Sequence, residues 1–260
     1  MCALLYKIIG YEDRYQKDLQ LIKYPTAVFD LIFDHTLQSH SNPYLLGVSG
    51  LCGSGKSTFM HGLFNYFHEL PDSKLNCYLF SADMFVNQID RDTRYQIALE
   101  KFGKYPQHKE EYWFAYDILG LSNTLFSLKK GRSVDFSGLY SKKTYTLDSY
   151  LNIPLGEIFQ SHIRTIILTE GTSLVHPLLR PLFDRLYFMH TPEFLCLERM
   201  QKTRANDDSQ VVEKYFKNLI ERRFKIEYSE ICNAEENLRV IEQDEKGILQ
   251  NPRTEINWQY

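Results

Sequence analysis

The sequence lacks the long apolar runs, clustered cysteines and one-sided charge that mark several common classes of protein. No stretch approaches the ~20 apolar residues of a membrane-spanning helix, and the chain begins without a signal-peptide pattern. The 5 cysteines are scattered, and neither they nor the 8 histidines show metal-ligand spacing. The net charge of -3 indicates no strongly basic face. We therefore expect a reduced, cytoplasmic protein that binds neither a membrane nor nucleic acid.

The arrangement of apolar segments predicts an α/β fold. Short apolar runs alternate with helical patterns, which is typical of a mostly parallel sheet covered by helices on both faces. Strands are predicted at residues 44–49, 77–80, 133–136, 165–169, 185–189 and 238–241, and helices at 27–33, 58–70, 114–130, 192–202 and 210–228. We expect one three-layer domain over residues 41–260, preceded by a helical N-terminal extension over residues 1–40.

A glycine-rich motif follows the first of these strands. Residues 50–57 read GLCGSGKS and match the P-loop pattern G-x-x-x-x-G-K-[ST] at every fixed position. Glycines let the backbone adopt positive φ and approach phosphates closely, and the loop amides lie at the positive end of a helix. A chance glycine-rich turn is the alternative, but the strand before the motif and the helix after it favour a P-loop. The predicted nucleotide-binding residues are Gly50, Cys52, Gly53, Ser54, Gly55, Lys56, Ser57 and Thr58.

Three side chains near this motif predict ATP and Mg²⁺ as the cofactors. Lys56 would place a positive charge on the β and γ phosphates, and the Ser57 hydroxyl would ligate Mg²⁺. Glu170 ends a predicted strand, where α/β proteins build their sites, and would hold Mg²⁺ through water. Its alternative role is to cap the following turn. The sequence contains neither the N-K-x-D motif of GTPases nor the acidic pair of a mechanical ATPase, which favours a small kinase.

The order of the segments resembles the uridine kinase, phosphoribulokinase and pantothenate kinase group of P-loop kinases. The resemblance covers about residues 44–204 and leaves the first forty residues out. It rests on the P-loop, on FSADMF at residues 80–85, FAYD at 114–117, GRSV at 131–134, ILTEG at 167–171, and residues 183–188 with the arginines that follow. The chain departs from the group on the acceptor side, since Tyr112 and Trp113 replace a proline and Ala205 follows Arg204 where the group has aspartate.

The resemblance implies a P-loop NTPase fold with a helical lid and a general base. Asp83 would orient and deprotonate the acceptor hydroxyl, and its alternative role is to cap the next helix. Arg199 and Arg204 would close over the phosphates as a lid, although arginines are also common on helix surfaces.

The acceptor site is predicted on the segments between Asp83 and the strand at residues 165–169. Aromatic and acidic side chains there would stack on a flat base or hold sugar hydroxyls, although such aromatics often pack in a core. Alternating charges near residue 94 also fit the solvated start of a helix, and the polar loop at residues 137–144 also fits a solvated turn. The predicted acceptor residues are Arg94, Glu111, Trp113, Asp117 and Tyr140.

Together these patterns predict a kinase that transfers the γ-phosphate of ATP to a hydroxyl of a small molecule, with a nucleoside-like or sugar-like acceptor favoured. One alternative is a kinase for a polynucleotide end or a protein, which would need a basic groove. Another is a regulatory module that hydrolyses ATP slowly, which would need a defective acceptor site. The sequence leaves open the acceptor, the choice of ATP or GTP, and the oligomeric state, a homo-oligomer included.

Overall fold

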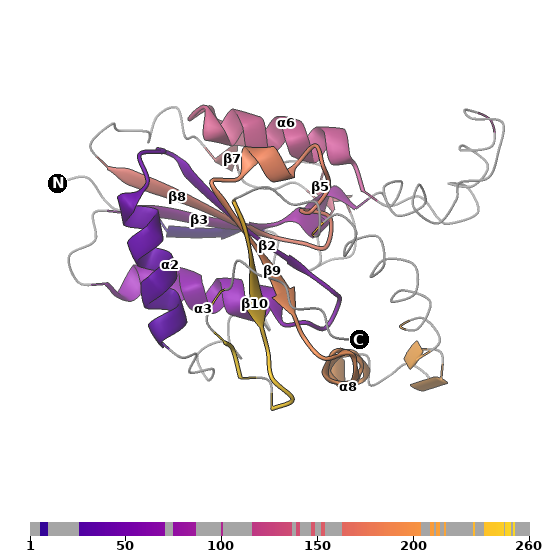
Figure 1. The fold of residues 1–260 in the computed structure, drawn as a ribbon. Coiled ribbons are helices and arrows are strands. Elements are labelled where there is room, and N and C mark those ends of the chain that lie inside the picture. The colour runs from indigo at the N-terminus through magenta and orange to yellow at the C-terminus, as the bar shows by residue number, and fades with distance from the viewer. Residues whose placement is uncertain are drawn as a thin grey trace.

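The computed structural model describes the following parts of the chain: residues 6–9, 26–70, 75–86, 100, 116–136, 139–140, 147–148, 152–153, 163–203, 209–210, 212–213, 216, 231, 237–246, 248–250 and 252. These parts form one six-stranded sheet with the order β1-β3-β8-β2-β9-β10 (Figure 1). All neighbouring strands of this sheet are parallel. The strands are Tyr6–Ile9 (β1), Tyr44–Gly50 (β2), Leu75–Ser81 (β3), Arg164–Glu170 (β8), Arg185–His190 (β9) and Leu238–Glu242 (β10).

The central strands are short apolar runs because helices cover both of their faces. Every residue of β2 and of β3 is buried, as expected for parallel strands in the middle of an α/β sheet. β2 and β8 are neighbours, and the chain runs from β2 to β3 in one direction along the sheet and from β8 to β9 in the other. In such sheets a ligand site forms outside the carboxyl ends of the strands at this point.

Helices on the two faces complete three layers. α2 (Thr26–Gln38) and α3 (Lys56–Glu69) pack on one face, and α6 (Ile118–Lys129) lies on the other (Figure 1). The first face is filled by an apolar cluster that includes Phe29, Phe59 and Phe67. The second is filled by a cluster that includes Leu125 and Phe136. This arrangement confirms the predicted three-layer α/β fold.

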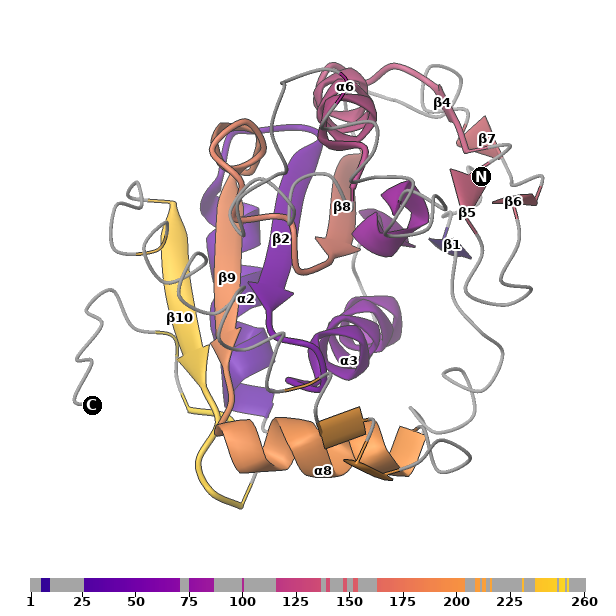
Figure 2. The same cartoon turned by 90° about the vertical axis from the view of Figure 1, so that its right-hand side faces the viewer.

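Shorter elements lie around the ends of the strands. Figure 2 shows α8 (Glu193–Thr203) running across the carboxyl ends, near the start of α3. Two 3-10 turns are also present: η2 (Ala82–Phe85) follows the carboxyl end of β3, and η3 (Arg180–Leu182) precedes the amino end of β9. Two small antiparallel pairs join Val134–Asp135 (β4) to Asn152–Ile153 (β7) and Leu139–Tyr140 (β5) to Leu147–Asp148 (β6).

Most of the predicted elements occur within a few residues of their expected positions. The predicted helix at 114–130 begins later, at Ile118, because the Asp117 carboxylate accepts a hydrogen bond from the Gly120 amide and caps it. Within the predicted helix at 210–228, the described residues 210, 212–213 and 216 are helical.

The first forty residues contribute more than the predicted helix. They supply α2, and they also supply β1, a strand that the sequence analysis does not predict and that pairs with β3. The predicted domain boundary at residue 40 stays a prediction. Among the parts of the chain listed above, no helix combines the length and apolarity that crossing a bilayer requires.

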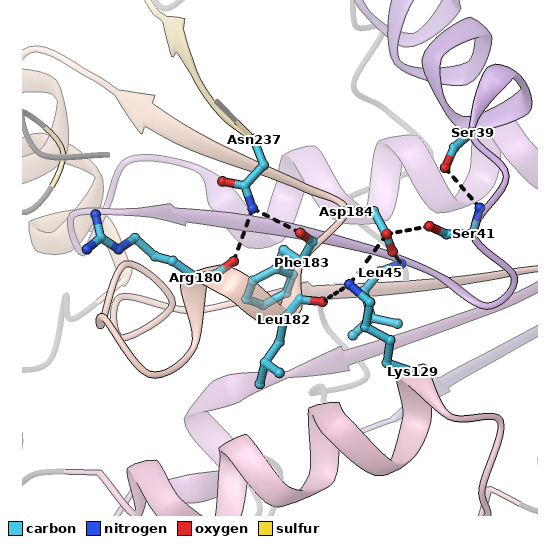
Figure 3. A network of polar contacts seen from close by, with 9 residues as sticks. All are labelled: Ser39, Ser41, Leu45, Lys129, Arg180, Leu182, Phe183, Asp184 and Asn237. Carbon is cyan, nitrogen blue, oxygen red and sulfur yellow. Dashed lines mark hydrogen bonds and ion pairs between the residues drawn. The ribbon is translucent and has the colours of Figure 1, made fainter. Parts of the chain in front are cut away.

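A polar network fastens the amino ends of three strands (Figure 3). These ends lie on the opposite side of the sheet from α8 (Figure 2). Asp184 accepts hydrogen bonds from the Leu45 amide at 2.8 Å and from the Ser41 hydroxyl at 2.6 Å. Its Oδ1 also lies 3.4 Å from Nζ of Lys129, at the end of α6. Asn237 donates to the carbonyl oxygens of residues 180 and 183 at 3.1 and 2.9 Å. The starts of β2, β9 and β10 are therefore tied together by side chains.

Replacing Asp184 with alanine should destabilise the fold strongly. Leu45 is fully buried, so its amide would lose its acceptor without gaining water, at a cost of about 2 kcal/mol. Urea unfolding of Asp184→Ala should show this loss in the free energy of unfolding. Glu198→Ala, which breaks an exposed ion pair with Lys202, is the matched control and should unfold like the parent chain. Equal stability of Asp184→Ala and the parent chain would contradict the anchoring role.

Candidate functional site

The loop between β2 and α3 has a backbone path that glycine makes possible. Gly50, Gly53 and Gly55 have φ angles of +145°, +79° and +93°, which residues with a side chain rarely adopt. Space is also closed to larger residues. A Cβ at Gly53 would collide with the carbonyl oxygen of Cys196 in α8, and one at Gly50 would lie 2.6 Å from that of Met189. The predicted P-loop is therefore present with the backbone geometry that the motif requires.

Lys56 is the first residue of α3 and lies inside this loop. Its side chain is buried, with 7% exposed, and its Nζ donates to the Leu51 carbonyl at 2.7 Å. Within the described residues no carboxylate forms an ion pair with it. An ammonium group has three donors, and a buried charge is costly without a counter-charge. The loop therefore holds a positive charge that an anion would complement. Ser57 and Thr58 follow in the first turn of α3, both half-buried.

α8 and β9 hold the outer side of the loop through its carbonyl groups. Nη1 of Arg199 lies 3.3 Å from the Gly53 carbonyl oxygen and 3.2 Å from that of Ser54. The Thr191 hydroxyl donates to the same Ser54 oxygen at 3.0 Å. In a trans peptide the carbonyl and the following amide point in opposite directions. The Gly55 amide is therefore directed away from Arg199, toward the inner side of the loop.

Gln243 connects Arg199 to the end of β10. Its side-chain Oε1 accepts a hydrogen bond from Nη1 of Arg199 at 2.9 Å, and its backbone amide donates to the His190 carbonyl at 2.8 Å. Gln243 is buried, so it holds the guanidinium on the loop side of α8. Arg199, predicted to close over the phosphates, thus supports the loop backbone in this structure. Its predicted contact with phosphates stays a prediction.

Two titratable side chains beside the loop are shifted toward their neutral forms. Burial raises the pKa of the Cys196 thiol to about 12, although Lys56 and Arg199 act in the opposite direction. Burial also lowers the pKa of His190, against the opposing effect of Glu242. Neither group therefore adds a charge beside Lys56 and Arg199 near neutral pH, and the positive charge at this end of the sheet comes from the lysine and the arginine.

The carboxylates of the site lie at the ends of the two neighbouring strands. In the sheet register, Glu170 of β8 is opposite Ser81 of β3 and Val48 of β2. The Ser81 hydroxyl donates to Oε1 of Glu170 at 2.8 Å, and the glutamate is 1% exposed. Gly171 then packs so closely on η2 that an added Cβ would lie 2.6 Å from Cβ of Ala82. The strand pairing therefore places Glu170 beside the strand that leads into the P-loop.

Asp83 lies on η2, two residues beyond the end of β3. Its amide donates to Oγ of Ser81 at 3.3 Å, so Ser81 caps this turn. Asp83 lies in the first turn of η2 and is not the cap of η2, and its role as the general base stays a prediction. The Asp83 side chain is half-buried, and its Oδ1 accepts from the Tyr116 hydroxyl at 3.3 Å. The same hydroxyl lies 2.8 Å from Oγ1 of Thr172.

The predicted acceptor residues are only partly within the described structure. Asp117 caps α6 with its carboxylate, on the exposed side of the chain. Tyr140 lies on β5, whose backbone packs beside η2 and thus near Asp83. Both stay predictions as acceptor contacts. The other predicted residues, Arg94, Glu111, Trp113 and the lid residue Arg204, lie outside the described residues.

Sequence reasoning missed four side chains that shape the site. Ser81 and Thr172 flank the predicted functional residues Asp83 and Glu170, and their position beside strand ends was the available signal. Tyr116 lies in a segment that carries the family resemblance, but its contact with Asp83 depends on tertiary packing. Gln243 follows the last strand by one residue, and nothing local indicates that it reaches Arg199.

The same residues can be tested for a metal site. In the described part of the chain, no group of three or more His, Cys, Asp or Glu side chains is close enough to hold a metal ion by itself. Ser57 could supply one oxygen ligand and Glu170 could hold the ion through water, and Mg²⁺ commonly takes its remaining ligands from water and phosphate. A Mg²⁺ site here would therefore depend on a bound nucleotide.

Comparison with known proteins finds solved structures with a similar fold. No protein-family model matches the sequence. A protein described as a possible uridine kinase, from Bacillus stearothermophilus, aligns with a TM-score of 0.51 and 19% identity over 82% of this chain and 97% of that one. A protein described as a fructose transport system kinase, from Silicibacter sp. TM1040, aligns with a TM-score of 0.55 and 16% identity over 82% and 96%. The resemblance to the uridine kinase group is thus confirmed at the level of the fold.

Removing Arg199 should weaken nucleotide binding even without an acceptor. Arg199→Ala deletes the donors that hold two loop carbonyls, so the loop should lose order and ATP affinity should fall about tenfold. Isothermal titration with a non-hydrolysable ATP analogue measures this directly. Glu198→Ala, on the exposed side of the same helix, should bind the analogue normally. Unchanged binding combined with a lower turnover rate would instead indicate a lid that acts only during transfer.

Proposed function

We propose that this chain is an ATP- and Mg²⁺-dependent kinase that phosphorylates a hydroxyl group of a small molecule. The observation that carries the proposal is the buried Lys56 ammonium inside a loop of left-handed glycines. Such a loop presents amides and a positive charge to an anion, and phosphate is the ligand that this geometry suits. Glu170 and Asp83 lie at adjacent strand ends, where the other parts of a phosphoryl-transfer site belong.

The comparisons support the reaction class. Both similar structures reported above are described as kinases, and both span most of this chain. The sequence departs from GTPases and mechanical ATPases at the motifs that define those classes. A small-molecule acceptor also suits the net charge of -3, because a polynucleotide substrate would favour a basic groove.

The residues present fit a nucleotide with its metal. Gly53 and Gly55 permit the positive φ angles that shape the loop, and the Ser54 hydroxyl is buried with no hydrogen-bond partner among the described residues. The Ser57 hydroxyl offers a hard oxygen ligand, the type that Mg²⁺ prefers, and Glu170 would hold the ion through water. Bound with the nucleotide, Mg²⁺ would supply charge neutralisation on the phosphates.

The chain's own groups account for the transfer step. Lys56 and the loop amides would neutralise charge on the β and γ phosphates and hold them in place. Asp83 would accept the proton of the acceptor hydroxyl, whose oxygen bonds to the γ phosphorus as the bond to the β–γ bridging oxygen breaks. The products are the phosphorylated acceptor and ADP, and the proton stays on Asp83 until solvent removes it.

The nature of the acceptor follows from the same resemblance. We infer a nucleoside-like or sugar-like alcohol, because the segment around Asp117 resembles the acceptor side of uridine kinases. A cytoplasmic location is consistent with the free thiols of Cys52, Cys77 and Cys196, since reduced cysteines are normal in that compartment.

Two substitutions should separate binding from chemistry. Lys56→Ala should weaken ATP binding, and Asp83→Asn should leave ATP binding intact while lowering acceptor-dependent ADP release at least a hundredfold. The assay uses ATP and Mg²⁺ with nucleosides, pentoses, phosphorylated sugars, pantothenate-like alcohols and a polynucleotide. Lys130→Ala, an exposed lysine at the end of α6, is the control for lost positive charge and should behave like the parent chain.

The same assay can overturn the proposal. Slow ADP release that needs no acceptor, disappears in Lys56→Ala and persists in Asp83→Asn would indicate a nucleotide-hydrolysing regulatory module. Release that depends on the polynucleotide alone would indicate a kinase for nucleic-acid ends.

A further inference from the structure

The hydroxyl of Tyr116 lies where three separate parts of the chain meet. Tyr116 precedes α6 and pairs with Val86, just after η2. Its ring is buried, with 7% exposed, and its hydroxyl contacts Asp83 after β3 and Thr172 after β8. The next residue, Asp117, donates its amide to the Phe85 carbonyl at 2.8 Å. The backbone of Tyr116 and Asp117 is therefore fixed to the turn that carries Asp83.

The direction of these hydrogen bonds can be assigned from their chemistry. A phenol has one hydrogen to donate, and an ionised carboxylate can only accept. Tyr116 therefore donates to Oδ1 of Asp83, and the Thr172 hydroxyl donates to the Tyr116 oxygen. Thr172 is itself held, because its carbonyl accepts from the Ser49 hydroxyl at 3.3 Å, next to the start of the P-loop.

The contacts form a closed path around the candidate chemistry. Ser81 joins the Asp83 amide to the Glu170 carboxylate, the chain runs from Glu170 to Thr172, and Tyr116 returns from Thr172 to Asp83. The backbone of Asp83 is thus set by Ser81, and its carboxylate is set by Tyr116. A base must point at the proton it removes, and a small misplacement of a reacting group can reduce a rate greatly.

We propose that Tyr116 is a positioning residue for the general base: its hydroxyl, held by Thr172, fixes the carboxylate of Asp83 toward the acceptor hydroxyl. The inference rests on the proposed kinase function and on Asp83 as its base. The segment before α6, which the sequence analysis assigns to the acceptor side, is thus joined by a hydrogen bond to the group that accepts the proton. Tyr116 acts through Asp83.

The test is a double-mutant cycle on acceptor-dependent phosphoryl transfer. Tyr116→Phe removes only the hydroxyl and should lower kcat about tenfold, with the KM for ATP and the acceptor-free rate of ATP hydrolysis unchanged. In an Asp83→Asn background the same substitution should have no further effect, because the group it positions is already disabled. Thr172→Val, which keeps the shape of the side chain, should lower kcat to a smaller extent.

Controls separate this role from a general loss of packing. Tyr78→Phe removes another buried phenol oxygen, on β3, and should leave kcat unchanged. Circular dichroism and thermal unfolding of all variants show whether the fold is intact. The residual rate of Asp83→Asn is measured by single-turnover detection of labelled product.

The outcomes distinguish this inference from the function on which it rests. A normal kcat for Tyr116→Phe, or an equal loss of rate in both backgrounds, overturns the positioning role while leaving Asp83 as the base. Full activity of Asp83→Asn overturns the assignment of the base and the role of Tyr116 with it. A tenfold loss that occurs in the parent chain and not in Asp83→Asn supports both the positioning role of Tyr116 and the assignment of Asp83 as the base.

Discussion

The parallel register between β3, β8 and β2 is the constraint on which the whole site depends. It places Ser81 opposite Glu170 and Glu170 opposite Val48, so the three strands reach their ends side by side. Gly171 then permits a close approach to Ala82 that any side chain would prevent. A shift of one residue in either pairing would turn every side chain of the moved strand to the opposite face of the sheet. The two carboxylates and the loop glycines would no longer face one common space.

The P-loop depends on a second layer of contacts as much as on its own glycines. Positive φ angles shape the loop, but the carbonyl groups that face outward are satisfied by Arg199 and Thr191. These bonds orient the peptide planes, and oriented planes are what direct amides toward a bound anion. The Cys196 backbone closes the same side by packing on Gly53. α8 therefore helps to shape the P-loop through its contacts with the loop backbone.

Local pattern was enough to predict the sheet, its main helices and the loop. Short apolar runs that end in Gly50, Asp83 or Glu170 are visible without any knowledge of packing, because burial on both faces leaves a continuous apolar signal. β1 escaped prediction because it is short and the segment around it mixes apolar and charged residues, although Gly10 follows it directly. The partners of Asp83 and Arg199 escaped for a different reason. Tyr116 and Gln243 reach them from positions 33 and 44 residues away, and no local pattern records such a distance.

Because Asp184 and Asn237 anchor the starts of the strands, the two ends of the sheet differ in how much sequence change they can tolerate. At the amino ends of the strands, these two side chains hold backbone groups of neighbouring segments through hydrogen bonds, so few replacements there would be tolerated. At the carboxyl ends, turns and loops rest on a sheet that does not change when their sequences do. Such a scaffold lets loop sequences diverge without refolding the sheet, and different ligand specificities within one architecture are the expected result.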